Sequence, residues 1–341
     1  MSDKRYLGNI ITQNPTAPSG PYEDSTAPGV WSLAEALAYT KADLWPTAGN
    51  ALPVEGIFAG GIYPGINTMQ SINFSTLGDA KDFGNLSATA YGGAGFSSST
   101  RAVMGLGYSG SDTNTLEYVT FSTLGNSQDF GDLTVARNSG ASMSSSTRGV
   151  FAGGKENNTT IDYVTIASTG NATDFGDCFN INIVRQFNMG CSNGTRGVFA
   201  GGIDNSNFTR SNVMQYITIA STGNSADFGD LTSGRFCCTG FSNTTRGVFA
   251  GGSNGSIATI IDYITVASTG NATDFGDLST SRGDAAGMSS LTRGVITGGN
   301  TNSIEYITIA STGNGADFGD MLPDASNYGF ASACSSTHGG L

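Results

Sequence analysis

The amino-acid sequence predicts an all-β protein that folds as a closed β-propeller of six blades. Glycine accounts for 50 of the 341 residues, which is well above the share of about 7% that is typical of proteins. One segment rich in glycine and β-branched residues recurs six times along the chain, and the two ends of this array carry complementary halves of one unit. So much glycine without a collagen period favours a turn-rich fold, and the in-phase apolar residues argue against disorder.

Each copy of the repeat contains three recognisable pieces. The run Gly-Val-Phe-Ala-Gly-Gly at 149–154 recurs, with variation, at 56–61, 102–107, 197–202, 247–252 and 294–299. A run such as Ile-Asp-Tyr-Val-Thr-Ile follows, then a Ser-Thr-Gly-Asn turn and the motif Asp-Phe-Gly-Asp. The motif phenylalanines are Phe83, Phe130, Phe175, Phe228, Phe275 and Phe318. Successive phenylalanines lie 47, 45, 53, 47 and 43 residues apart. This spacing is close to the roughly 40–50 residues of a four-stranded propeller blade.

Four strands are expected in each repeat. The glycine-pair run and the tyrosine-containing run supply two of them, and the second has the β-branched and aromatic composition that strands favour. The Asp-Phe-Gly-Asp motif makes a third strand or an edge. The fourth is built of small residues, as at 138–143 and 283–288. Since blades converge on a central channel, small side chains suit the innermost strand.

The ends of the array predict how the ring closes. The first copy starts with the glycine-pair run, and the last copy ends with the small-residue strand at 327–336. Pairing of 331–335 with 56–60 would complete one blade and remove exposed sheet edges. We therefore divide the chain into an N-terminal arm with a docking helix at 1–50 and a six-repeat propeller at 51–341.

The N-terminal arm has its own signals. Four prolines within 14–29 predict an extended segment. A capping box, Ser-Leu-Ala-Glu at 32–35, starts an expected short helix that ends near residue 42.

Two tryptophans flank this expected helix. Because tryptophan is a favoured interface anchor, we predict that Trp31, Leu37 and Trp45 dock the propeller onto a particle or a sister subunit. The alternative is that the helix caps the propeller and buries its tryptophans there.

Charge and cysteine content disfavour several classes of function. A net charge of −12 with 15 Lys and Arg disfavours binding to nucleic acid or to an anionic membrane. We see no secretory leader and no run of 18 apolar residues, so we expect neither secretion nor membrane insertion. The five cysteines lack a spacing pattern, and we expect free, buried thiols from a reducing cytosol.

Few residues suit catalysis. The single histidine, His338, occupies the slot that other repeats fill with arginine, and we expect a turn residue there rather than a general base. The Asp-Phe-Gly triplet lacks the other loops of a protein kinase, and zinc motifs and phosphate loops are absent from the sequence. We predict no enzyme activity, no catalytic, cofactor-binding or metal site, and no cofactor.

Two repeated charged positions leave alternatives open. Asp174 and Asp177 could hold a hard cation, although bonds from such aspartates to turn amides are the favoured interpretation. The repeated arginines could form a rim that grips anions or sugar acids, whereas the favoured interpretation pairs each with a nearby aspartate. They are Arg101, Arg148, Arg196, Arg246 and Arg293.

The order of glycine pair, tyrosine strand and later aromatic resembles kelch repeats, although phenylalanine stands where kelch units usually carry tryptophan. The segments 161–177 and 27–36 more closely resemble repeat proteins of marine bacteriophages, especially those of cyanobacteria. This resemblance covers nearly the whole chain and implies a virion structural protein.

The expected role is a tail-associated fibre or adhesin for host recognition. The loops at 155–160, 203–213 and 253–259 occupy one position of the repeat, so they should cluster on one face. Expected partners are other virion proteins, through the arm, and a host-surface glycan or protein. We expect a homo-oligomer in a virion assembled in the host cytoplasm.

Three alternatives remain open. The first is a decoration protein of the capsid or neck. The second is a polysaccharide-degrading propeller enzyme, although the Asp-boxes typical of sialidases are not matched. The third is a soluble scaffold inside a cell, like many kelch proteins.

Overall fold

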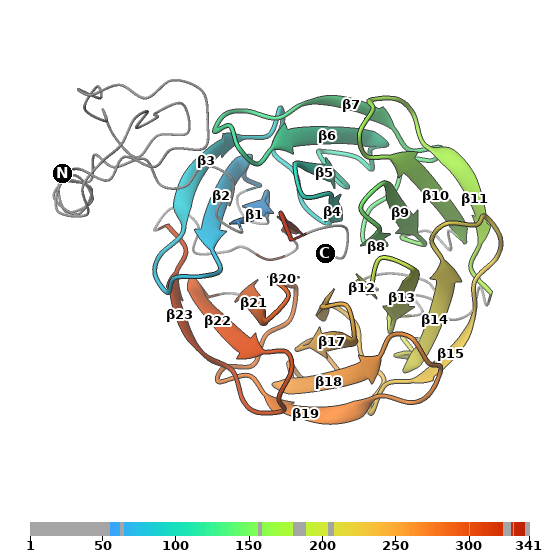
Figure 1. Cartoon of the computed structure of the whole chain (residues 1–341), viewed down its shortest axis with the longest axis vertical. Coiled ribbons are helices and arrows are strands. Elements are labelled where there is room, and N and C mark those ends of the chain that lie inside the picture. The colour runs from blue at the N-terminus through green and yellow to red at the C-terminus, as the bar shows by residue number, and fades with distance from the viewer. Residues whose placement is uncertain are drawn as a thin grey trace, which may run out of the picture. The chain divides into compact units, whose positions relative to one another are not determined.

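The computed structural model describes residues 55–61, 65–155, 159–179, 189–203, 208–299, 301–322, 329 and 331–337. Within these ranges, 24 strands and no helices form six four-stranded antiparallel sheets that surround a common centre (Figure 1). The prediction of an all-β, six-bladed propeller is confirmed. The predicted arm and its helix, with Trp31, Leu37 and Trp45, lie outside the described residues, as does His338.

The blades are numbered along the chain, and their strands run outwards from the centre. Blade 1 contains β24 (Ser332–Ser335), β1 (Glu55–Ala59), β2 (Thr68–Asn73) and β3 (Lys81–Asn85). Blade 2 contains β4 (Gly95–Ser97), β5 (Arg101–Gly105), β6 (Thr115–Thr120) and β7 (Gln128–Asp132). Blade 3 contains β8 (Ala141–Ser144), β9 (Arg148–Ala152), β10 (Thr160–Thr165) and β11 (Thr173–Asp177).

The second half of the ring repeats this order. Blade 4 contains β12 (Met189–Ser192), β13 (Arg196–Ala200), β14 (Val213–Thr218) and β15 (Ala226–Asp230). Blade 5 contains β16 (Thr239–Ser242), β17 (Arg246–Ala250), β18 (Ile260–Thr265) and β19 (Thr273–Asp277). Blade 6 contains β20 (Ala285–Ser289), β21 (Arg293–Gly298), β22 (Ser303–Thr308) and β23 (Ala316–Asp320).

The ring closes in blade 1, where the last strand pairs with the first. Strands β24 and β1 are antiparallel, with Gly56 opposite Ser335 and Ala59 opposite Ser332. The predicted pairing of the two ends of the repeat array is therefore confirmed. Closure in this way leaves no open blade between the last repeat and the first.

The small-residue strands are innermost, as predicted, but they start later than the sequence suggested. Strand β8 begins at Ala141 rather than 138, and β20 begins at Ala285 rather than 283. Ser139 has a φ of 59° and Asp284 a φ of 61°. This left-handed backbone is incompatible with a strand, so the chain turns into the ring at these residues.

The first glycine of the glycine-pair run makes room for the preceding blade. A Cβ atom on Gly149 would overlap the Phe96 ring, and one on Gly294 would overlap the Phe241 ring. Both phenylalanines are fully buried side chains of an innermost strand. The glycines therefore let large apolar side chains seal the seams between blades, where burial of apolar surface stabilises the fold.

The Ser-Thr-Gly-Asn turn joins each blade to the outermost strand of the blade before it. The backbone N–H of Gly223 donates to the carbonyl of Phe175 at 2.8 Å, and Asn224 Oδ1 accepts from the N–H of Asp177 at 3.0 Å. The same bonds recur at all six seams, with Asp79 in place of asparagine where blade 6 meets blade 1. The Ser-Thr-Gly-Asn turn therefore recurs because its last two residues form the hydrogen bonds that join neighbouring blades at the outer seam.

Candidate functional site: the loop face and its central pit

The two ends of the propeller differ in how the chain uses them. In every blade the loop between the second and third strands and the link to the next blade lie at one end, which we call the loop face. The turns between the third and fourth strands, and in blades 2 to 6 also those between the first and second strands, lie at the other end, the turn face. Antiparallel pairing of consecutive strands fixes this arrangement. The described parts of the predicted variable loops therefore share the loop face.

The turn face repeats one structure from blade to blade. The first residue of each inner turn accepts a hydrogen bond from the backbone N–H of the arginine three positions on, at 2.8–3.2 Å. These first residues are Ser98, Ser145, Asn193, Asn243 and Ser290. Such bonds favour tight turns over continued strand.

The arginines of the turn face correct one prediction, because none of the five pairs with an aspartate in the described chain. Each guanidinium stacks on the tyrosine ring of its own blade, 4.2–4.6 Å from the ring centroid. Each also donates through Nη1 to a carbonyl of the next blade, as Arg148 does to Ile219 at 2.9 Å. The aspartates that open the outermost-strand motif, such as Asp174, are exposed, where an ion pair gains little.

Three buried ion pairs brace the links beneath the loop face, and the sequence analysis missed them. They are Arg137–Asp162 at 2.9 Å, Arg235–Asp262 at 3.0 Å and Arg282–Glu305 at 2.8 Å. Each joins the link that enters a blade to the third strand of that blade. The signal was an acidic residue within an otherwise apolar strand, because a buried charge needs an ion pair or hydrogen bonds.

Burial lowers the pKa of Arg137, and the nearby carboxylate of Asp162 opposes part of that effect. The pairs therefore fix the links in position, so that the residues just after them enter the ring at a defined place.

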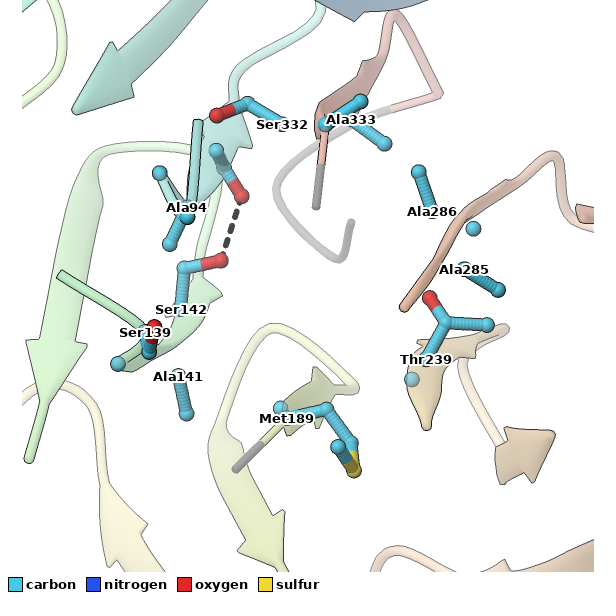
Figure 2. A pocket seen from close by; sticks show the side chains of 18 of the residues that line it. Ala94, Ser139, Ala141, Ser142, Met189, Thr239, Ala285, Ala286, Ser332 and Ala333 are labelled. Atoms are coloured by element: carbon cyan, nitrogen blue, oxygen red, sulfur yellow. Dashed lines mark hydrogen bonds between the residues drawn. The ribbon is translucent and has the colours of Figure 1, made fainter. Parts of the chain in front are cut away.

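A cavity of about 100 Å³ lies at the centre of the ring (Figure 2). Its wall consists mostly of glycine, alanine and serine from the six innermost strands, and Met189 is its largest apolar side chain. The hydroxyl of Ser142 donates to the carbonyl of Gly95 at 2.6 Å across a seam between blades. We call this cavity the central pit.

The pit wall ends two residues before a ring of serines that we call the serine belt. Five of its hydroxyls donate to the carbonyl of the belt serine in the preceding blade, at 2.6–3.3 Å. The members are Ser97, Ser144, Ser192, Ser242, Ser289 and Ser335, and each is at most 2% exposed. The belt was not predicted, although serine ends all six innermost strands.

The pit opens at the loop face among residues that differ from blade to blade. Ser139, Cys237 and Asp284 hold equivalent positions with φ between 57° and 61°, where blade 2 has Gly92. Burial raises the pKa of the Asp284 carboxyl, and a hydrogen bond from the Cys237 thiol opposes this. Burial also raises the pKa of Cys237. All five cysteines are free and buried, as predicted.

Beside the pit, blade 2 carries two stacked tyrosines. The rings of Tyr91 and Tyr108 lie 4.9 Å apart between centroids and are tilted by 34°. The backbone N–H of each donates to the carbonyl of the other, at 3.1 and 2.9 Å. Next to them, the Asn138 amide donates to the Asp112 carboxylate. We call these four residues the blade-2 aromatic site.

Among the described residues, no group of three or more His, Cys, Asp or Glu side chains could hold a metal ion. The Asp177 carboxylate accepts a hydrogen bond from Thr159 Oγ1 at 3.1 Å.

No helix in the described ranges is long and apolar enough to cross a membrane.

These features define a six-bladed β-propeller with a uniform turn face and a varied loop face. The fold is similar to the solved structure of YjhT, with a TM-score of 0.57 and 8% sequence identity, covering 72% of this chain and 87% of that one. At this identity the likeness shows the fold alone. No protein-family model and no curated protein matches the chain.

Proposed function

We propose that this chain is a structural protein of a bacteriophage virion that binds the host surface through its loop face. In this proposal the propeller is a tail-associated adhesin, and residues 1–50 attach it to other virion proteins. The observation that carries the proposal is the contrast between the two faces.

The contrast is clearest at positions that are equivalent between blades. On the turn face, Arg101 and Arg246 each stack on a tyrosine and bond a carbonyl of the next blade. On the loop face, one equivalent position holds Tyr91, Asn138 or Phe236 in blades 2, 3 and 5. A rigid scaffold that keeps one face constant and varies the other is typical of recognition.

The resemblance to repeat proteins of marine bacteriophages supports the virion part of the proposal. It rests on the segment 161–177, which forms strands β10 and β11 with the turn between them. It also rests on the leader at 27–36. Together these point to a particle component rather than to a free scaffold.

Antibody labelling of intact purified virions tests the location. Label at the tail or its fibres supports the adhesin, whereas label over the head or neck would identify a decoration protein. If mass spectrometry finds no such protein in the particles, the virion proposal fails.

Docking through the arm has its own test. Replacing Trp31 and Trp45 together with alanine should leave the propeller folded and abolish incorporation into particles. Normal incorporation of the double variant would show that these residues do not dock it.

The same proposal holds that the propeller binds its ligand without transforming it. Purified protein incubated with host capsule or lipopolysaccharide should leave the chain length unchanged. The appearance of shorter chains would instead make the protein a polysaccharide-degrading enzyme.

A further inference from the structure

The blade-2 aromatic site stands out on the loop face because its two rings are fixed in place before any ligand arrives. Tyr91 belongs to the link from blade 1, and Tyr108 lies in the loop between β5 and β6. Two hydrogen bonds join the backbones of the two residues, their rings stack on each other, and both residues are half-buried. Part of this aromatic surface therefore faces solvent in a defined orientation, so little conformational entropy is lost on binding.

The polar neighbours of the rings are also fixed. Asn138 is only 8% exposed; its amide donates to Asp112, and its Oδ1 accepts from Ser139 Oγ at 2.6 Å. Asp112 has no ion-pair partner in the described chain. A carboxylate has about four lone-pair sites, so Asp112 keeps acceptor capacity for a hydroxyl group.

We infer that the blade-2 aromatic site binds a pyranose ring of a surface glycan, an inference that rests on the proposed adhesin role. A pyranose has an apolar face of C–H groups, which matches the solvent-exposed part of the Tyr108 ring, and a rim of hydroxyls, which matches an oriented carboxylate. The carboxylate and the net charge of −12 favour a neutral sugar over an acidic one.

Blades 3 and 5, where both equivalent positions are described, lack this combination. At the equivalent pair of positions, blade 5 has Phe236 with Ser253, joined by the same backbone bridge, and blade 3 has Asn138 with Lys155. Blade 5 thus carries an aromatic ring and the same backbone bridge at the equivalent position, with Ser253 where blade 2 has Tyr108, which makes Phe236→Ala a matched control.

The test is saturation-transfer NMR of the full chain with the methyl α-pyranosides of glucose, mannose, galactose, N-acetylglucosamine and rhamnose. At least one should receive saturation at its ring C–H protons. Tyr108→Ala should weaken this binding about tenfold, equivalent to roughly 1.4 kcal/mol. Tyr108→Phe and Phe236→Ala should retain it. A thermal melt of each variant shows whether the propeller remains folded.

Two results would overturn the inference: none of the five glycosides binds, or Tyr108→Ala binds as well as the original chain. Attachment of the labelled protein to host cells distinguishes failure of the sugar-site inference from failure of the adhesin proposal. If the protein attaches and Tyr108→Ala attaches equally, the sugar site is wrong and the adhesin proposal stands. If the unaltered protein does not attach, the adhesin proposal itself fails, whatever the glycosides show.

Discussion

Ser97 donates its hydroxyl hydrogen to the carbonyl oxygen of Ser335, at an Oγ–O distance of 2.6 Å. The two serines lie in β4 and β24, which belong to opposite ends of the repeat array. This bond carries the serine belt across the junction where the ring closes. Ser335 differs from the other members, since its own buried Oγ has no hydrogen-bond partner among the described residues.

This difference predicts unequal effects of alanine substitution within the belt. Ser242 Oγ donates to the carbonyl of Ser192 at 2.6 Å and accepts from its N–H at 3.0 Å. Ser242→Ala leaves both groups buried without that partner and should lower the free energy of unfolding by about 1–3 kcal/mol. Ser335→Ala removes a buried hydroxyl that makes no hydrogen bond in the described chain, so it should not lower the free energy of unfolding.

Urea unfolding of the two variants measures the difference, with the exposed Ser146→Ala as the control. Equal losses for Ser242→Ala and Ser335→Ala would show that the belt hydrogen bonds do not stabilise the ring.

The belt also shows where sequence reasoning stops. Strand composition, repeat length and the complementary ends were enough to predict six blades and the pairing of β24 with β1. A serine at the end of a strand, by contrast, is only a small polar residue until the ring brings six of them together. Bonds between residues about a blade apart, such as Ser192 and Ser242, depend on how neighbouring blades approach each other.

The glycine of the Asp-Phe-Gly-Asp motif predicts a second effect. Gly176 has a φ of 146°, and a Cβ there would lie 2.6 Å from the carbonyl carbon of Gly223 in the next blade. Gly170 has a similar φ of 153° but has open space around it. Gly170→Ala should cost only its backbone strain, about 1–3 kcal/mol, and Gly176→Ala should cost more because the outer seam must also open.

Thermal unfolding of the two variants separates the cost of opening the outer seam from the cost of backbone strain alone. If Gly176→Ala melts no lower than Gly170→Ala, close approach of the neighbouring turn is not what requires glycine in the motif.

The buried pair in blade 6 predicts a third effect. Arg282 and Glu305 approach to 2.8 Å with both side chains nearly inaccessible. Arg282→Met leaves the buried carboxylate of Glu305 without its ion-pair partner and should lower the free energy of unfolding by about 3–5 kcal/mol. Adding Glu305→Gln should restore part of the loss, because blades 1 and 4 carry Gln70 and Gln215 at this position. A double-mutant cycle by urea unfolding measures the coupling, and a double variant less stable than Arg282→Met would contradict it.

The candidate site was less accessible to prediction than the fold. Variation among the loops indicated one recognition face, and the topology places those loops together. The stacking of Tyr91 on Tyr108 could not be predicted, because the two rings come from a link and a loop that meet only through a short backbone bridge. The arginine pairing was predicted wrongly, since counting charges ignores the tyrosine ring and the carbonyl that lie nearer.

The mouth of the central pit predicts a dependence of stability on pH. Burial raises the pKa of Asp284 above its ordinary value of 3.8, so the folded state binds this proton more tightly than the unfolded state. Stability should therefore fall as the pH rises from about 3.8 through the raised folded value, and stay lower above it. Asp284→Asn removes the buried charge and tolerates the left-handed backbone, so it should be more stable than the original chain at pH 7.

Below a pH of about 3.8 the advantage of Asp284→Asn should disappear, because the carboxyl is then protonated in both states. Melting temperatures of the two proteins across this range measure the effect. Asp317→Asn, on the exposed part of β23, is the control and should show no such gain. An advantage for Asp284→Asn that persists at low pH would mean that the side chain acts through packing rather than through its charge.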